Sequence, residues 1–373
     1  MAPTPKTPHP RQSERATRAR SLAWCAALFV AAGCGDAKPG QPASGANSNA
    51  PLANASSALN PVQAALEEGV KLAQAGKLPE AIATFERGLR LEPENGKLRH
   101  EKGVALIQLN VPAQAEAEFS LGIEAEPGRW DNWYDRAIAR MQLGRSADAE
   151  ADFRKSLELN PQNEAGHYNL GYLLESQALV VLGSVSQDVE KLGQAAQCYQ
   201  RAIDVQPAFD AARARLGFVR ARLGETEDAR REFSAVLARN PRQPLALLEG
   251  ARMELNAGEI DAAAPLVERL LEVQPDSAEA HYVAGQLAEE QSALEKARTA
   301  YERAFELDTS HAQALYRLAA VRETLGDADG AHKARAAYEE IKRLGTEVSE
   351  KLAAMNSRPD DLLAKYEYAK ALA

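Results

Sequence analysis

A residue that recurs every 34 positions constrains the fold of this chain more than any other feature of its sequence. The series consists of Pro93, Pro127 and Pro161, then Pro207, Pro241 and Pro275, and finally Thr309. The two proline series lie 46 residues apart, which is one period plus 12, so the same frame resumes after an insertion. With this residue at position 32, the chain divides into eight units: 62–95, 96–129, 130–163, 164–209, 210–243, 244–277, 278–311 and 312–345. Such a period indicates an array of small units that bury their apolar faces by stacking.

Small and bulky side chains recur in the same frame. Position 20 is alanine in every unit, at Ala81, Ala115, Ala149, Ala195, Ala229, Ala263, Ala297 and Ala331. Position 8 is never larger than alanine, at Gly69, Gly103, Ala137, Gly171, Gly217, Ala251, Gly285 and Ala319. Position 24 is Phe, Tyr or Val until the last unit, at Phe85, Phe119, Phe153, Tyr199, Phe233, Val267, Tyr301 and Arg335. Because two helices can cross closely only where a small residue faces a large one, each unit is predicted to be a packed helix pair.

The predicted turn between the two helices lies at position 15. In the uninterrupted units this position holds Gly76, Asn110, Gly144, Gly224, Gly258, Ser292 and Gly326. Most of these residues enter the left-handed backbone region at low cost, which ends a helix. The proline at position 32 ends the second helix, because proline lacks an amide donor and restricts the residue before it.

A 34-residue helix-turn-helix unit with this pattern resembles the tetratricopeptide repeat (TPR), and the resemblance covers residues 62–345. It implies an all-α fold: a right-handed α-solenoid of eight TPR helix-turn-helix repeats with a C-terminal capping helix. The composition agrees, since 45% of the residues are hydrophobic but only 6% are aromatic, which suits Ala- and Leu-rich packed helices. The resemblance also implies a non-enzymatic scaffold or adaptor for protein–protein interaction.

Residues 1–33 have the order of a secretory signal peptide of the lipoprotein type. Four arginines precede an apolar run, 22–32, that is shorter than the roughly 20 residues of a membrane-spanning helix. The residues around Cys34 resemble the lipobox of bacterial lipoproteins, in which the cysteine is lipidated. Ala31 stands where that motif usually has leucine, so cleavage without lipidation, or no cleavage, are alternatives. We therefore expect a chain in the bacterial cell envelope, anchored through Cys34 and facing the periplasm, or else a soluble secreted or periplasmic one.

Residues 34–60 are rich in Gly, Ala, Ser, Asn and Pro, which predicts a disordered tether or an ordinary disordered tail. The formal net charge is −9, and residues 1–33 carry five basic side chains against one acid, which leaves −13 for the rest. Nucleic acid is therefore not expected as a partner, because phosphate binding depends on Lys and Arg. Cys25 lies in the signal segment and Cys198 is expected to be a packed side chain, so no disulfide framework is predicted.

Two segments depart from the regular array. The 12 extra residues of the fourth unit fall within 175–194 and include the apolar run 178–182. They predict a lengthened hairpin, either a projection for docking or membrane contact or a segment packed on the next repeat. Residues 346–373 begin with polar helix formers and then resemble the first helix of another unit from Pro359 onward, so they predict a C-terminal cap or a partial ninth repeat.

In TPR proteins, positions 2, 5, 9 and 12 of the first helices line the concave face, and the resemblance implies a partner-binding groove here. The residues expected in it are Tyr134, Ile138, Met141, Tyr168, Tyr172, Phe218, Tyr282 and Tyr316. Exposed aromatic side chains favour binding of a peptide or helical segment, although padding of the superhelix is the alternative. Four acidic residues in the C-terminal half favour a neutral or basic partner, or form a solvated face: Glu279, Glu289, Glu290 and Glu323.

The sequence predicts no catalytic site. It holds no Gly-rich phosphate loop, nucleophile elbow, paired-ligand metal motif or Cys–His arrangement, so we expect no enzyme activity, no cofactor and no metal. His167 and His281 occupy position 4, where we expect them to serve in packing. The alternative function is that of an accessory protein, secreted without a lipid anchor, that captures a small molecule or substrate.

Overall fold

The computed structural model describes residues 60–179, 188–358 and 361–371, within which every regular element is an α-helix. The chain divides after Leu109 into two compact units. The predicted signal peptide, Cys34 and the tether up to residue 59 lie outside the described residues, as do residues 180–187 of the insertion. In chain order the described helices are the first and second helices of eight repeats, followed by one more helix, which confirms the predicted all-α repeat fold.

The first unit contains three helices: α2 (Pro61–Gln74), α3 (Leu78–Leu89) and α4 (Gly96–Gln108). Asparagine side chains begin two of them, because the amide oxygen of Asn60 accepts from the backbone N–H of Val62 (3.1 Å) and that of Asn95 from Leu98 (3.0 Å). Such caps satisfy backbone donors that have no partner within the helix. Phe85 fills the core of this unit with no exposed surface.

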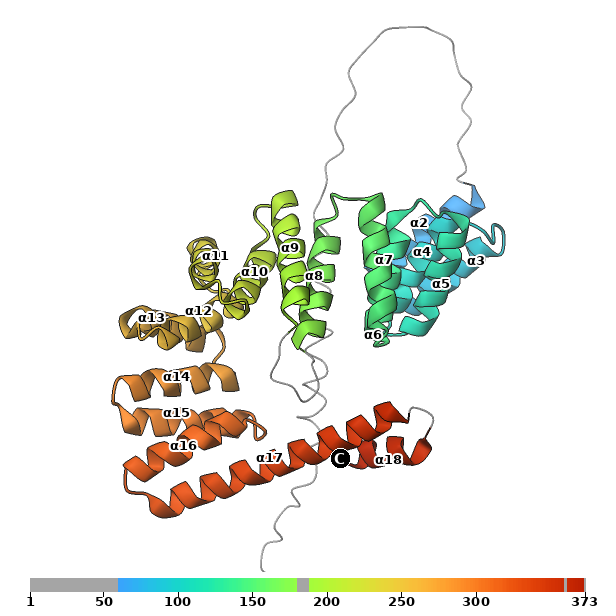
Figure 1. The fold of residues 1–373 in the computed structure, drawn as a ribbon. Helices are drawn as coiled ribbons and strands as arrows, with labels where there is room; N and C mark the ends of the chain where they lie inside the picture. The colour runs from blue at the N-terminus through green and yellow to red at the C-terminus, as the bar shows by residue number, and fades with distance from the viewer. Residues whose placement is uncertain (1–59, 180–187, 359–360, 372–373) are drawn as a thin grey trace, which may run out of the picture. The chain divides into compact units, whose positions relative to one another are not determined.

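The second unit runs from residue 110 on and contains the helices α5 to α18 (Figure 1). Its helices are α5 (Pro112–Ala125), α6 (Trp130–Gln142), α7 (Ser146–Leu159), α8 (Glu164–Leu179), α9 (Val189–Val205), α10 (Asp210–Arg222), α11 (Thr226–Arg239), α12 (Pro244–Asn256), α13 (Ile260–Val273), α14 (Ala278–Glu290), α15 (Leu294–Leu307), α16 (Ala312–Thr324), α17 (Ala328–Ser357) and α18 (Leu362–Ala371). The second helices that precede a position-32 proline in this unit end two residues before it, since the residue before proline avoids the helical region.

The small and large positions of the repeat meet within the pairs that have glycine at position 8 in this unit, as predicted. Phe153 and Ala149 have no exposed surface. A Cβ atom added to Gly217 would lie 2.7 Å from the ring of Phe233, so no larger residue fits at position 8 of that pair. The core of this unit is therefore a series of contacts between large and small side chains along the helix pairs, and not one central cluster.

The turns follow the prediction at position 15. All seven residues expected there have a positive φ, which ranges from 57° at Ser292 to 83° at Gly224. A non-glycine residue at such an angle is uncommon, and Asn110 and Ser292 are the two examples among the described residues. In these seven units the first helix therefore stops where a left-handed residue reverses the chain.

The inserted residues lengthen both helices of the fourth pair. Helix α8 has 16 residues and α9 has 17, against 13 and 14 in the neighbouring pair α10 and α11. Of the apolar run at 178–182, Ala178 is buried and Leu179 is 42% exposed, and the rest lies outside the described residues.

The end of the array also differs from a regular repeat. Helix α17 runs for 30 residues, so the expected unit boundary at 345 falls inside it. No proline interrupts residues 328–357, and position 32 of the eighth unit is Arg343, so nothing stops the helix there. Helix α18 packs along α17, and an ion pair between Lys351 and Glu367 (3.5 Å) joins them (Figure 1).

Candidate partner-binding surface

The residues predicted to form a groove lie on the first helices of the second unit, but their exposure differs. Tyr316 is 61% exposed, whereas Ile138 and Phe218 are each only 9% exposed. The other five are partly buried: Tyr134, Met141, Tyr168, Tyr172 and Tyr282. We call the surface formed by positions 2, 5, 9 and 12 of α6, α8, α10, α12, α14 and α16 the first-helix face.

Tyr134 joins the third repeat to the fourth. Its ring packs edge-on against Phe153 at a centroid distance of 5.8 Å, and its hydroxyl oxygen accepts a hydrogen bond from Nδ2 of Asn169 (2.7 Å). Burial raises the pKa of this hydroxyl, because the phenolate would lose its hydration. Tyr134 therefore supports the joint between repeats as well as the surface.

A buried polar cluster, which we call the Tyr–Glu–Arg cluster, joins the fourth repeat to the fifth. The hydroxyl of Tyr199 donates to Oε2 of Glu175 (2.6 Å), and Nη1 of Arg215 donates to Oε1 of the same carboxylate (2.7 Å). The side chain of Glu175 is 4% exposed, so burial raises its pKa, although Arg215 and the Tyr199 hydroxyl act in the opposite direction. The carboxylate is held by two donors in a site that excludes water.

Aromatic side chains surround this cluster. Tyr168 packs against Tyr199 (5.7 Å between ring centroids) and against Phe209 (5.1 Å). The guanidinium of Arg215 lies 4.7 Å from the ring centroid of Tyr172 and also hydrogen-bonds the Tyr168 side chain. These contacts fix the position of Arg215, which keeps 22% of its side chain exposed.

The same cluster occurs again between the seventh and eighth repeats, at the same repeat positions. The hydroxyl of Tyr301 donates to Glu289, and Nη1 of Arg317 lies 3.5 Å from Oε2 of that carboxylate. Tyr282 takes the place of Tyr168, at 5.7 Å from Tyr301 and 4.9 Å from His311. These clusters were not predicted from the sequence. Their signal there is a tyrosine at position 24, a glutamate at position 12 and an arginine at position 6 of the next unit.

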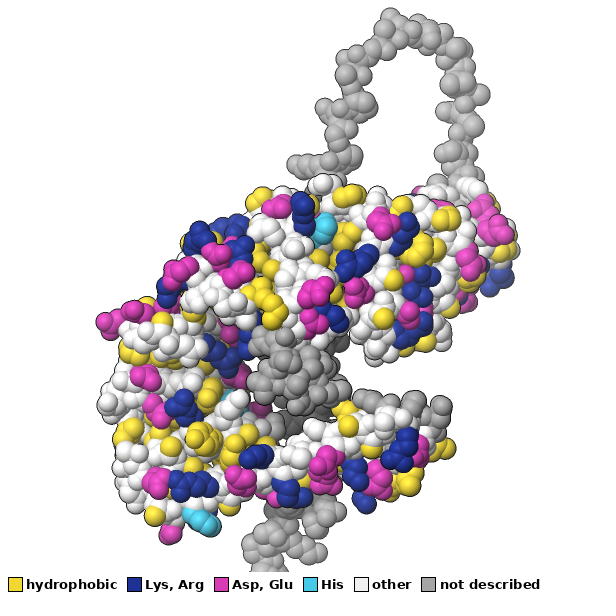
Figure 2. All heavy atoms as spheres, viewed as in Figure 1, with side chains coloured by type: hydrophobic (Ala, Val, Ile, Leu, Met, Phe, Trp, Pro, Cys, Tyr) yellow, Lys and Arg dark blue, Asp and Glu magenta, His cyan; other side chains and the backbone are white. Residues whose placement is uncertain are grey.

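Most of the acidic residues expected to make the C-terminal half negative are paired with arginine. Glu279 is paired with Arg252, Glu289 with Arg317, and Glu323 with Arg335, while Glu290 is exposed. The paired arginines offset the negative charge of three of the four residues, and the alternative of a solvated face stays a prediction. Figure 2 likewise shows acidic and basic side chains interspersed on the face in view.

The histidines at position 4 form hydrogen bonds as well as packing contacts. Nε2 of His167 lies 3.0 Å from the carbonyl oxygen of Pro161, and Nε2 of His281 lies 2.9 Å from that of Pro275. A carbonyl oxygen only accepts, so Nε2 carries the proton in both rings. Trp133 donates in the same way to Pro127 (3.0 Å). Position 4 thus links each of these repeats to the proline that ends the one before.

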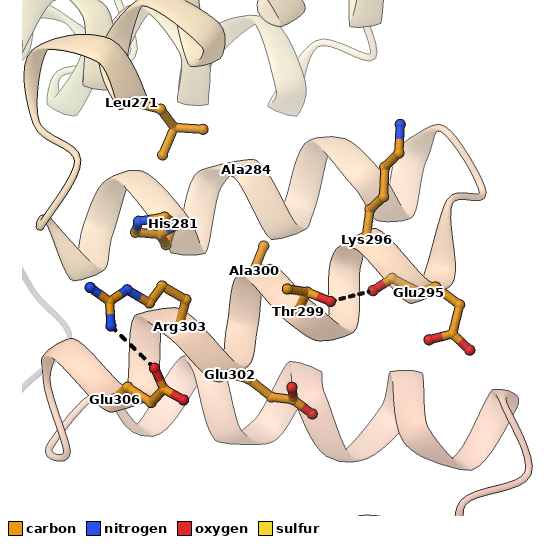
Figure 3. A pocket seen from close by; sticks show the side chains of 10 residues that line it. All are labelled: Leu271, His281, Ala284, Glu295, Lys296, Thr299, Ala300, Glu302, Arg303 and Glu306. Atoms are coloured by element: carbon orange, nitrogen blue, oxygen red, sulfur yellow. Dashed lines mark hydrogen bonds and ion pairs between the residues drawn. The ribbon is translucent and has the colours of Figure 1, made fainter.

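An open hollow of about 600 Å³ lies away from the predicted groove, between α13, α14 and α15 (Figure 3). Charged side chains of α15 form much of its wall, among them Lys296 and Arg303, and His281 lies at one side. Arg303 forms an ion pair with Glu306 (3.2 Å). The hollow contains no pair of nucleophile and base, and we assign it no chemistry.

Within the described residues, no group of three or more His, Cys, Asp or Glu side chains is arranged to hold a metal ion. None of the helices in the same part of the chain combines the length and apolar character needed to cross a bilayer. Cys198 is a free, partly buried thiol, and burial raises its pKa to about 11, which disfavours the reactive thiolate.

Three family models, each described as a tetratricopeptide repeat, match the chain. One matches residues 72–141, a second 130–163, and a third matches 180–244, 219–264 and 248–309, so that together they cover more than half of the chain. A search of curated protein sequences found no match.

Solved structures with a similar fold share little sequence identity with the chain. A tetratricopeptide repeat protein from Parabacteroides merdae is 17% identical, with a TM-score of 0.51 over 70% of this chain and 98% of its own. The hetero-tetramer Cut9–Hcn1 of the APC/C gives 15% identity and a TM-score of 0.52 over 79% of this chain and 53% of the matched one. PilF of Pseudomonas aeruginosa gives 16% and 0.50 over 59% and 95%. At these identities the likeness concerns the fold alone.

Proposed function

The chain belongs to the tetratricopeptide-repeat family, and from this premise we propose that it is a non-enzymatic scaffold that binds peptide or helical segments of partner proteins. We place the binding on the first-helix face of the second unit. The observation that carries the proposal is the row of tyrosines at position 5, Tyr134, Tyr168, Tyr282 and Tyr316, each braced by a second aromatic ring. Braced tyrosines offer a large contact area with little loss of side-chain entropy on binding.

Site-specific photo-crosslinking tests this proposal. A photoreactive phenylalanine analogue in place of Tyr316, which is 61% exposed, should crosslink a protein partner in cells that express the chain. The matched control carries the same analogue at Arg201, an exposed residue of the second helix α9, and should give no crosslinked product. Equal crosslinking from both positions, or crosslinking from Arg201 alone, would contradict binding on the first-helix face.

We also propose that the chain is a lipoprotein of the bacterial envelope, anchored through Cys34 and facing the periplasm. The support is the order of the N-terminal sequence: basic residues, a short apolar run, small residues before Cys34, and a Gly-, Ala- and Ser-rich segment. Such a tether would leave the repeat array free to meet its partners beside the membrane.

The substitution Cys34→Ser should move the protein from the membrane fraction to the soluble fraction. The matched control is Cys198→Ser, which replaces the cysteine of the repeat array and should leave the protein with the membranes. If the unmodified chain is already found in the soluble fraction, secretion without an anchor is supported instead. If the Cys34→Ser variant still sediments with the membranes, lipid anchoring is refuted.

A further inference from the structure

Three aromatic rings of the first-helix face lie beside two arginines of α10, and we call this set the aromatic–arginine patch: Tyr168, Tyr172, Arg215, Phe218 and Arg222. Its two tyrosines are spaced by four residues on α8, and the other three are spaced by three and four residues on α10. These spacings put each set along one side of its helix. The contact between Arg215 and Tyr172 joins the two sets into one surface.

Two guanidinium groups lie over aromatic rings in this patch. Arg215 lies over Tyr172 at 4.7 Å, and Arg222 lies over Phe218 at 5.0 Å. Phe218 is only 9% exposed, whereas Arg222 is exposed. A partner therefore meets the edges of these rings and the outer faces of the guanidinium groups, which is a surface suited to apolar side chains and to acceptors of hydrogen bonds.

The two arginines differ in their charge partners. Arg215 is neutralised by the buried Glu175. Arg222, in contrast, has no carboxylate within 4.0 Å in the part of the chain that the structure describes. The charge of Arg222 is felt by two carboxylates, Glu175 and Glu249. Each of them accepts a hydrogen bond from another arginine: Glu175 from Arg215 (2.7 Å) and Glu249 from Arg252 (3.2 Å). The accessible charge of the patch is therefore positive, on a chain whose net charge is −9.

We infer that the aromatic–arginine patch binds a peptide segment in which an acidic residue is flanked by apolar ones. The carboxylate would pair with Arg222 and the apolar side chains would lie along Tyr168 and Tyr172, so charge and apolar contact are both complementary. This inference rests on the proposed scaffold function and names the chemistry of the partner. It replaces the neutral or basic partner that the sequence favoured.

The second Tyr–Glu–Arg cluster shows that this chemistry is local. In the eighth repeat, Ala320 and Thr324 occupy the positions of Phe218 and Arg222. Arg317 is present there, but no second arginine lies on its side of α16. The preference for an acidic residue in the bound peptide is therefore expected of the fourth and fifth repeats and not of the seventh and eighth.

A phage-displayed library of random twelve-residue peptides, selected on the intact chain, tests the inference. We expect the enriched peptides to contain Asp or Glu beside Leu, Phe or Trp, well above their frequency in the starting library. The most enriched peptide, made synthetically, should bind the Arg222→Glu variant about tenfold or more weakly than the unmodified chain, and its affinity should fall with added salt. Arg201→Glu on α9 makes the same charge change away from the patch and should bind as the unmodified chain does.

The outcomes separate the two proposals. If no peptide is enriched, the scaffold function proposed above fails, and the inference falls with it. If peptides are enriched without excess acidic residues, or if Arg222→Glu binds as tightly as Arg201→Glu, the scaffold function stands and the inference is wrong. Circular dichroism of both variants should show unchanged helicity, because both arginines are exposed.

Discussion

Two neighbouring repeat interfaces bury side chains of nearly equal size in different ways. Between the third and fourth repeats, position 24 is Phe153, position 12 is Met141, and Asn169 donates a hydrogen bond to the hydroxyl of Tyr134. Between the fourth and fifth repeats, position 24 is Tyr199, whose hydroxyl is buried against Glu175. The buried hydroxyl of tyrosine needs an acceptor, which is the carboxylate of Glu175. That carboxylate in turn needs a cation, which is Arg215.

A buried polar atom determines which residues must lie on both sides of an interface. A buried hydroxyl without a partner is costly, and a buried carboxylate without a cation is costlier still. The seventh and eighth repeats meet the same requirements with Tyr301, Glu289 and Arg317. The three residues therefore act as one unit, and the interfaces with phenylalanine at position 24 do without it.

The largest expected effect comes from breaking the cluster at its cation. The substitution Arg215→Ala leaves Glu175 buried without its ion pair and should lower the free energy of unfolding by about 3–5 kcal/mol. Urea denaturation followed by circular dichroism measures this loss. A loss below about 1 kcal/mol would mean that the charge of Glu175 is solvated in the folded chain.

The loss should also depend on pH. The folded-state pKa of Glu175 is raised by burial, so the folded chain holds its proton to higher pH than the unfolded chain, and stability falls as pH rises through that window. Arg215 lowers this pKa, so its removal widens the window. The penalty of Arg215→Ala should therefore be smaller at about pH 4 than at about pH 7.

A medium effect is expected from adding the hydroxyl where no cluster exists. Phe153→Tyr should destabilise the chain by about 2 kcal/mol, because Met141 offers the new hydroxyl no strong acceptor. Adding Met141→Glu and Asn169→Arg rebuilds the cluster and should recover much of that loss in thermal denaturation. If the triple variant is no more stable than Phe153→Tyr alone, the three residues do not act as a unit.

The smallest effect concerns a second position that differs between the same interfaces. The hydroxyl of Ser156 is fully buried with no hydrogen-bond partner, while Ala202 occupies the equivalent place one repeat later. Ser156→Ala should therefore raise the free energy of unfolding by about 1 kcal/mol. Differential scanning calorimetry would show a higher melting temperature, and a lower one would indicate that the hydroxyl has a bound water as its partner.

The period of the sequence was enough to predict the helix pairs, their turns and their interlocked residues. Ala149, Phe153 and Gly224 were predicted correctly because the position of each within its own repeat decides whether it is buried or forms the turn. The end of the array was harder to predict, since the absence of a helix stop after residue 345 is a weaker signal than a proline. Helix α17 therefore runs on where a boundary was expected.

The candidate site was less predictable than the fold, for a physical reason. Positions in the repeat indicate which helix face a side chain occupies but not which distant residue covers it. Phe218 was expected to be exposed, yet the guanidinium of Arg222 covers its ring. Glu289 was expected to favour a neutral or basic partner or to form a solvated face, yet it is paired with an arginine 28 residues later. Such pairs are found only when positions are compared between units.

The hydrogen bonds from position 4 to the preceding proline carbonyl have a consequence for the direction of the helices. His167, His281 and Trp133 each lie in the first turn of a first helix, and each donates to a carbonyl oxygen in the turn before that helix. The start of each of these helices is therefore restrained relative to the preceding repeat by a contact that is separate from the apolar core.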